Sequence, residues 1–105
     1  MLQNVFCFAG FSALHFAAEN NQPKSLELLL TSNADPNLKT KKVRHRDRIT
    51  PLVIAIEYGS TKMCEVLLKY KADPNARYMD TDLTPLHLAA QLGKVEVVRL
   101  LIRYV

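Results

Sequence analysis

Apolar residues recur three and four positions apart in three short stretches of the chain. The three sets are Leu14, Ala17 and Ala18, then Leu52, Ala55 and Ile56, and then Leu86, Ala89 and Ala90. Side chains with this spacing share one face of an α-helix. Each stretch is therefore expected to form a short helix whose apolar, mostly small face lets a neighbouring helix approach closely.

A second apolar stripe follows each stretch after a turn. Its members are Leu26, Leu29 and Leu30, then Cys64, Leu67 and Leu68, and then Val98, Leu101 and Ile102. The same spacing predicts a second helix with a continuous apolar face. The chain is thus expected to form three helix-turn-helix units.

Signals for the start of a helix stand in front of the short stretches. Thr50 and Thr84 each offer a hydroxyl to the unpaired amides at a helix N-terminus. Pro51 and Pro85 follow at the first helical position, where the missing N–H is no loss. Both signals predict that the short helices begin there.

Residues that tolerate positive φ mark the ends of the helices. Gly59 and Gly93 are expected to end short helices in the left-handed conformation, and Asn21 is the next-best residue in the first unit. Lys71 stands where a left-handed glycine is expected, which costs on the order of 1 kcal/mol relative to glycine. Asn33 takes the equivalent position in the first unit, and asparagine adopts this conformation more readily.

An Asp-x-Asn loop closes each of the first two units. It contains Asp35 and Asn37 in the first unit, and Asp73 and Asn75 in the second. Side chains of these types bond nearby backbone groups in turns. Each unit is therefore expected to run helix, turn, helix and polar loop.

The repeated motif carries a resemblance to a known family. Thr84-Pro85-Leu86-His87-Leu88-Ala89-Ala90 has counterparts at residues 12–18 and 50–56. The chain resembles ankyrin-repeat proteins, whose period of about 33 residues carries a T-P-L-H-x-A signature. The resemblance implies an all-α solenoid of stacked helix-turn-helix repeats with β-hairpin-like loops, which binds partner proteins through its concave side and loop tips.

The spacing of the motifs sets the expected boundaries. Ser12 and Thr50 are 38 residues apart, whereas Thr50 and Thr84 are 34 apart, so the first connection contains an insertion. The expected segments are residues 1–9 as an N-terminal segment and remnant of a preceding loop, 10–39 as repeat one, 40–48 as a basic inserted finger, 49–81 as repeat two and 82–105 as a truncated repeat three. Because repeat three ends before its polar loop, the chain is expected to be a fragment of a longer array, with a last repeat covered by a partner as the alternative.

Nine residues on the outward side of the short helices are candidates for partner contact. They are Phe16, Glu19, Asn20, Ile54, Glu57, Tyr58, Leu88, Gln91 and Leu92. They lie about 200° around the helix axis from the apolar face, and an apolar stripe edged by Glu and Gln suits a protein surface or an amphipathic helix. Phe16, Ile54 and Leu88 are equally compatible with repeat core. Tyr58 and Leu92 are favoured for contact, because the repeat pattern does not require an apolar residue there.

The formal net charge of +4 is concentrated in the inserted finger. Its candidate binding residues are Lys41, Lys42, Arg44, Arg46 and Arg48. They suit acidic protein or nucleic-acid phosphate, and 41–44 resembles a short nuclear-import signal; a solvated loop extension explains them equally well. An alternative function is thus a nuclear or nucleic-acid-associated regulator. Nucleic acid is the weaker option, because no aromatic residue interrupts the basic run to stack a base.

Catalytic and cofactor chemistry find no support in the sequence. There is no Gly-rich phosphate loop, no set of metal ligands and no Ser or Cys beside a His base. His15 and His87 are expected to fix helix starts, and Cys64 is expected to be a small core residue. The expected function is therefore a non-enzymatic protein-interaction scaffold without cofactor or metal.

Composition also indicates the cellular compartment and the kind of association that is expected. Two cysteines are too few for a disulfide framework, so a reducing compartment, the cytoplasm or the nucleus, is expected. No apolar run approaches the roughly 18 residues of a membrane span, and no secretory signal precedes the first repeat. The chain is expected to be monomeric unless the uncapped face of its last helix pairs.

Overall fold

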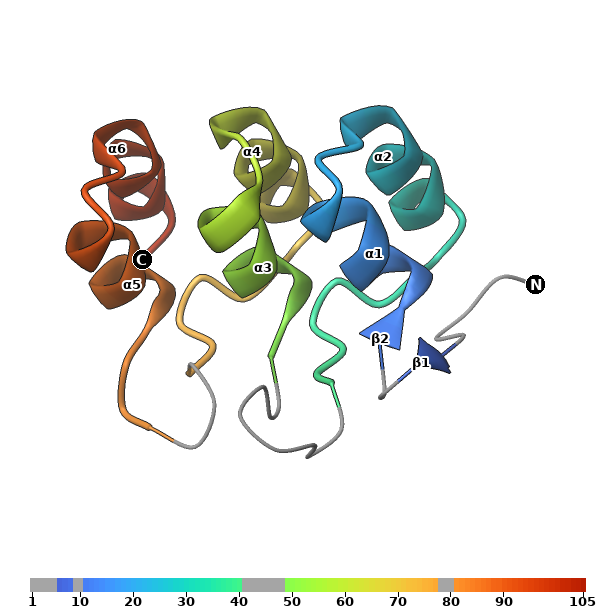
Figure 1. Cartoon of the computed structure of the whole chain (residues 1–105). Helices are drawn as coiled ribbons and strands as arrows, with labels where there is room; N and C mark the ends of the chain where they lie inside the picture. The colour runs from blue at the N-terminus through green and yellow to red at the C-terminus, as the bar shows by residue number, and fades with distance from the viewer. Residues whose placement is uncertain (1–5, 9–10, 41–48, 78–80) are drawn as a thin grey trace.

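The described part of the computed structural model contains six helices arranged as three stacked pairs (Figure 1). It describes residues 6–8, 11–40, 49–77 and 81–105. The helices are α1 (Ala13–Glu19), α2 (Pro23–Thr31), α3 (Pro51–Tyr58), α4 (Thr61–Lys69), α5 (Pro85–Gln91) and α6 (Val95–Tyr104). Short strands β1 (Phe6–Phe8) and β2 (Phe11–Ser12) form an antiparallel pair ahead of α1.

The pairs stack in sequence order, so that the short and the long helices form two layers. In the short-helix layer, α1 contacts α3 and α3 contacts α5. In the long-helix layer, α2 contacts α4 and α4 contacts α6. This arrangement confirms the predicted all-α solenoid of helix-turn-helix repeats.

The core lies at the contacts between successive repeats. Leu52, Ala55 and Ile56 of α3 are buried, as are Cys64 and Leu67 of α4. The burial of apolar area drives such packing, at about 25 cal/mol per Å². Since a thin helix pair has little interior of its own, these contacts between repeats provide most of the core.

The corresponding face of the third repeat is more accessible. Leu86 is half-buried and Ala90 is exposed, although the residues at the same positions of the second repeat are fully buried. Ile102 of α6 is likewise exposed. The difference follows from position, because none of the helices in the described residues packs on this side of α5 and α6.

Each short helix is capped by a hydroxyl side chain, as the sequence predicts at Thr50 and Thr84. The hydroxyl oxygens of Ser12, Thr50 and Thr84 accept hydrogen bonds from the backbone amide three residues on, at 3.4, 3.4 and 3.5 Å. Prolines occupy the first helical position in α3 and α5. The caps satisfy amides that would otherwise lack a partner at each helix start.

Four residues adopt the left-handed conformation at helix ends. Asn21, Asn33, Lys71 and Gly93 have φ values of 53°, 72°, 78° and 71°. The prediction is thereby confirmed for these positions, including the one occupied by lysine. A side chain with a Cβ is strained in this region, and asparagine less so than lysine.

The prediction for Gly59 was wrong. Gly59 caps α3 with φ −95° and ψ −165°, which is extended backbone. A Cβ atom at this position would lie 2.9 Å from the carbonyl oxygen of Ala55. Close approach to the preceding helical turn, not a positive φ, is therefore the reason for glycine here.

The Asp-x-Asn loops bond within themselves and to each other. The carboxylates of Asp35 and Asp73 accept hydrogen bonds from the amides of Asn37 and Asn75, each at 2.9 Å. The Asn37 side chain also donates to the carbonyl oxygen of Lys71 at 3.1 Å and accepts from the amide of Asp73. One asparagine thus ties the first loop to the second.

His15 joins the first two repeats through both ring nitrogens. The Ser12 amide donates to Nδ1 at 3.1 Å, and Nε2 lies 2.9 Å from the carbonyl oxygen of Ile49. An amide can only donate and a carbonyl can only accept, so the ring is neutral with its hydrogen on Nε2. Burial lowers the pKa of His15, although hydrogen bonds to the Ile49 and Leu38 backbone oppose the shift.

Replacing Lys71 by glycine should stabilise the protein. Glycine relieves the strain of φ 78°, and the expected gain is up to about 1 kcal/mol after the greater entropy of the unfolded chain is subtracted. Asn33→Gly is the matched control and should gain less, since asparagine tolerates φ 72°. Urea unfolding of both variants measures the difference. Equal gains would contradict the assignment of strain to Lys71.

His15 should make the stability depend on pH in the slightly acidic range. Because its folded pKa lies below the unfolded value of 6.5, its contribution is complete above pH 6.5 and declines as the pH falls. The slope can reach about 1.4 kcal/mol per pH unit. Urea unfolding from pH 7.5 to 5.5 should show this decline in the wild type and not in His15→Gln. His87→Gln should retain it, and a decline that persists in His15→Gln would refute the assignment.

Candidate functional site

The outward side of the short helices is mostly covered where the helices pack together. Ile54 is 0% and Leu88 6% exposed, and Phe16 is half-buried. Every residue of α3 from Pro51 to Ile56 is buried, because the helix packs against α1, α4 and α5. Of the two interpretations offered by the sequence, burial therefore favours repeat core for Ile54 and Leu88, and we remove both from the candidate surface. Half-burial does not decide between the two interpretations for Phe16, which is not included in the set defined below.

The last residues of the short helices remain accessible. Glu19 and Glu57 are half-buried, and Asn20 and Gln91 are exposed. Tyr58 and Leu92 are large apolar side chains with exposed fractions of 52% and 47%. We call the set Glu19, Asn20, Glu57, Tyr58, Gln91 and Leu92 the short-helix surface.

Stacking of the repeats places these six residues in two rows. Equivalent positions of α1, α3 and α5 lie on successive helices of the layer. One row is Glu19, Glu57 and Gln91, and the other is Asn20, Tyr58 and Leu92. Residues far apart in the sequence thus form one continuous surface across three repeats.

The two layers differ in charge. Glu19 and Glu57 are the only charged residues of α1, α3 and α5, so the short helices carry −2. The long helices α2, α4 and α6 contain five Lys or Arg and three Glu, or +2. The short and the long helices therefore carry formal charges of opposite sign, in a chain whose formal charge is +4.

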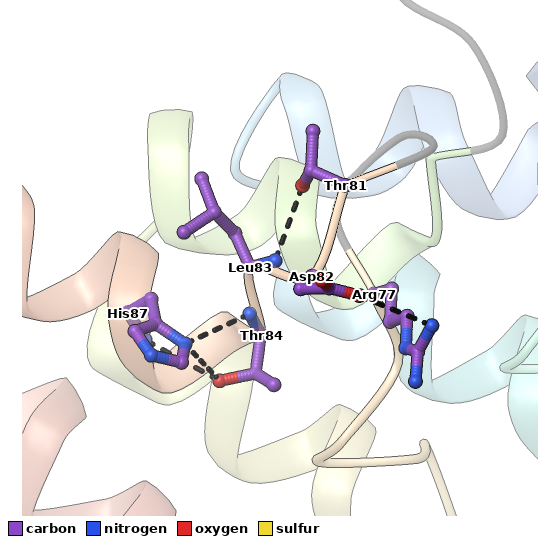
Figure 2. Close-up of polar contacts among 6 residues, drawn as sticks. All are labelled: Arg77, Thr81, Asp82, Leu83, Thr84 and His87. Atoms are coloured by element: carbon purple, nitrogen blue, oxygen red, sulfur yellow. Dashed lines mark hydrogen bonds and ion pairs between the residues drawn. The ribbon is translucent and has the colours of Figure 1, made fainter.

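The loop before α5 adds an apolar residue that the sequence analysis missed. Leu83 is 39% exposed and directly precedes the helix cap Thr84. Its amide donates to the Thr81 hydroxyl oxygen at 3.1 Å, as Figure 2 shows. The available signal was an apolar residue directly before the helix cap Thr84.

Polar contacts lie at both ends of the loop before α5 (Figure 2). Arg77 and Asp82 form an ion pair at 3.3 Å, and both side chains are exposed, so the pair adds little stability. The His87 Nδ1 accepts from the Thr84 amide at 3.1 Å and lies 2.9 Å from the Thr84 hydroxyl. The start of α5 thus has the same kind of cap that Ser12 and His15 form at the start of α1.

The candidate residues of the basic finger, 41–48, lie outside the described residues. Its two ends are described and are joined to each other. The Thr40 amide donates to the Ile49 carbonyl oxygen at 2.9 Å, and the Ile49 amide donates to the Thr40 hydroxyl at 2.9 Å. Both residues are buried, and the same Ile49 oxygen accepts from His15. The two ends of the insertion are therefore hydrogen-bonded to each other within the core.

Neither a reactive thiol nor a group of metal ligands is present among the described side chains. Burial raises the pKa of the Cys64 thiol to about 12, which keeps it protonated and unreactive. In the part of the chain that the structure describes, no three His, Cys, Asp or Glu side chains are grouped as metal ligands. The helices of these same segments are all too short or too polar to span a membrane.

Comparison with known proteins identifies the repeats. A family model described as ankyrin repeats (3 copies) matches residues 14–105. A putative ankyrin repeat protein of Fowlpox virus (strain NVSL) is 35% identical over 100 residues, which cover 91% of this chain and 28% of the viral protein.

Two human proteins show similar matches. Ankyrin repeat and SOCS box protein 2 of Homo sapiens is 42% identical over 65 residues, which cover 62% of this chain and 9% of that protein. Transient receptor potential cation channel subfamily A member 1 of Homo sapiens is 36% identical over 97 residues, or 90% of this chain and 8% of the channel. The chain thus spans less than a third of each of these relatives. The repeated caps, the stacked helix pairs and the family match together show that the chain belongs to the ankyrin-repeat family.

Proposed function

We propose that this chain is a non-enzymatic scaffold that binds a partner protein through the short-helix surface and the adjacent loop tips. Ankyrin repeats are in general protein–protein interaction modules. The observation that supports this site is the exposure of Tyr58 and Leu92 by about half, on neighbouring helices. Neither position needs an apolar residue for the repeat to fold.

The packing behind this surface suits recognition by a preformed site. Tyr58 follows six buried residues of α3, and the Gly59 amide closes that helix with a 2.8 Å hydrogen bond to Ala55. A surface that is ordered before binding loses less conformational entropy when the partner docks. Exposed tyrosine and leucine on such a support are suited to act as anchors in a partner's pockets.

Leu83 extends the surface toward the loop tips. It is held by the hydrogen bond to Thr81 and stands beside the cap of α5. A partner that covers Leu92 and the loop before α5 would therefore bury two leucines of one repeat. Apolar contacts of this size contribute about 1.5–3 kcal/mol each when fully buried.

Truncating both anchors should abolish most partner binding. We expect Tyr58→Ala/Leu92→Ala to weaken binding by about tenfold to a thousandfold, as for paired anchors at the centre of an interface. A partner captured from cell extract with the tagged wild-type chain would be identified, purified and titrated by calorimetry against each variant. Circular dichroism would check that the fold is retained.

The matched control changes a leucine and a tyrosine on the long helices. Leu28 and Tyr104 are 68% and 45% exposed, and lie on α2 and α6. Leu28→Ala/Tyr104→Ala should leave the affinity within about twofold, as expected for residues outside an interface. If this control loses binding while Tyr58→Ala/Leu92→Ala keeps it, the long-helix side is the interface and the proposed site is wrong.

A further inference from the structure

We infer that a hollow between the turns of repeats two and three, at the end of the short-helix surface, receives an acidic side chain of the partner protein. The carboxylate of this aspartate or glutamate pairs with Lys94, and a neighbouring apolar residue of the partner covers Val95. This inference rests on the proposed function and adds the chemical class of one contact. It follows from the hollow itself, from the unpaired charge of Lys94 in its lining and from the apolar residues beside it.

The hollow lies between the turn that joins α3 to α4 and the turn that joins α5 to α6. It has a volume of about 440 Å³ and is lined by residues 59–61 and 93–97. Pockets that hold ligand groups in proteins typically have volumes of about 300–1,000 Å³. Tyr58 and Leu92 directly precede the two lining segments, so a partner that covers the short-helix surface also reaches the hollow.

Lys94 is the only basic residue of this lining, and its charge lacks a partner. Lys94 is half-buried, and no described residue forms an ion pair or a hydrogen bond with its ammonium group. Burial raises the pKa of the Cys64 thiol, and the nearby charge of Lys94 opposes this rise, which shows that the charge lies close to the interior. A cation that is partly removed from water without a counter-ion is unfavourable, and a carboxylate bound beside it would relieve this cost.

Lysine is also a poor residue for the start of the helix that follows. Lys94 occupies the N-cap of α6 and makes no capping hydrogen bond, because an ammonium group cannot accept one. Ser60 stands at the equivalent position of α4, where its hydroxyl oxygen accepts from the Met63 amide at 3.4 Å. The helix dipole further disfavours a positive charge at this end. Since lysine costs stability here, binding explains its presence better than folding does.

Two further residues of the lining suit an acidic residue with an apolar neighbour. Thr61 is half-buried, and its hydroxyl makes no hydrogen bond within the described residues, so it can donate to a carboxylate. Val95 is 60% exposed, and Leu92, which directly precedes the lining, is 47% exposed. An apolar residue next to the acidic residue of the partner would therefore remove apolar surface of this chain from water.

Glu96 limits the amount of negative charge that the hollow can accept. Its carboxylate also belongs to the lining and is ion-paired with Arg99 at 3.7 Å, with both side chains exposed. The hollow therefore offers one unpaired cation beside an anion that is already paired. This arrangement suits a carboxylate, which carries one negative charge, better than a phosphate group, which carries close to two.

Peptide selection tests the inference without knowledge of the partner. A displayed library of short random peptides is joined to its carrier through the peptide C-termini, so that only side chains supply carboxylates. It is selected in parallel against the intact wild-type chain and against Lys94→Ser. Peptides enriched on the wild type should contain Asp or Glu next to an aliphatic residue, and the Lys94→Ser pool should lack this preference. Wild-type peptides without acidic residues, or the same acidic preference in both pools, would overturn the inference.

The most enriched acidic peptide is then synthesised with an amidated C-terminus, and its affinity is measured by fluorescence polarisation. Lys94→Ser should weaken binding by about tenfold, as expected for the loss of a charge-assisted contact. Lys24→Gln is the matched control, because it removes an exposed lysine from α2 in repeat one, and it should change the affinity by less than about twofold. An equal loss in both variants would show a general charge effect and would refute the assigned contact.

A double-mutant cycle tests the pairing itself. Replacing the acidic residue of the peptide by its amide, Asp by Asn or Glu by Gln, should weaken binding to the wild-type chain by about tenfold. The same replacement should have much less effect on binding to Lys94→Ser, because the cation is already absent. Equal losses on both forms of the chain would show that the carboxylate does not meet Lys94.

Lys94→Ser should fold at least as well as the wild type. Serine can cap α6 as Ser60 caps α4, so the midpoint of urea unfolding should rise. Higher stability together with weaker peptide binding would separate the binding role of Lys94 from any role in folding. A lower midpoint would show that Lys94 serves the fold, and the inference would then be wrong.

The outcomes separate this inference from the proposed function. Peptide binding that is lost in Tyr58→Ala/Leu92→Ala but unchanged in Lys94→Ser overturns the inference and leaves the proposed surface in place. Peptide binding that requires Lys94 but neither Tyr58 nor Leu92 supports the hollow as a site and overturns the proposed surface.

Discussion

The contact between the apolar faces of successive helix pairs is the interaction on which the whole structure depends. Ala17, Ala55 and Ala89 are buried at equivalent positions of the three short helices. Their small side chains allow the backbones to approach, and larger residues such as Leu52 and Leu67 fill the space between the layers. A single helix pair has too little interior to be stable, so stability arises as a sum of contacts between neighbours.

Polar contacts between repeats determine how the pairs sit on one another. The Asn37 side chain bonds the loop of repeat two through both the nitrogen and the oxygen of its amide, and His15 donates to the Ile49 carbonyl oxygen at the start of repeat two. Apolar packing is non-directional, whereas these hydrogen bonds require particular donors and acceptors to meet. They therefore favour one register of the stack, which in turn places Glu19 and Glu57, or Tyr58 and Leu92, in the same row.

The packing of the repeats also limits which side chains of the short helices are accessible. Because α3 is packed on several sides, only its last two residues are accessible on the surface of the short-helix layer. The equivalent residues at the ends of α1 and α5 are accessible as well, namely Glu19, Asn20, Gln91 and Leu92. These accessible positions are not used by the core, so their residues can differ between repeats without loss of the fold. The change from Asn20 to Tyr58 to Leu92 along one row is a variation of this kind.

Features that depend on short stretches of chain were predictable from the sequence alone. The helix pairs, the caps at Thr50 and Thr84 and the left-handed conformation of Lys71 all follow from local spacing and residue type. Such features are decided by backbone groups within a few residues of one another, so no knowledge of distant neighbours is needed.

The remaining features depend on distances between segments, and only the tertiary structure decided them. Ile54 and Leu88 could have been surface or core, and the proximity of neighbouring helices buries both. Gly59 is glycine because the carbonyl oxygen of Ala55 lies close by, and Leu83 is exposed because its loop leaves it uncovered. A sequence period indicates which face of a helix a residue occupies, but whether that face meets another segment depends on how closely the repeats pack.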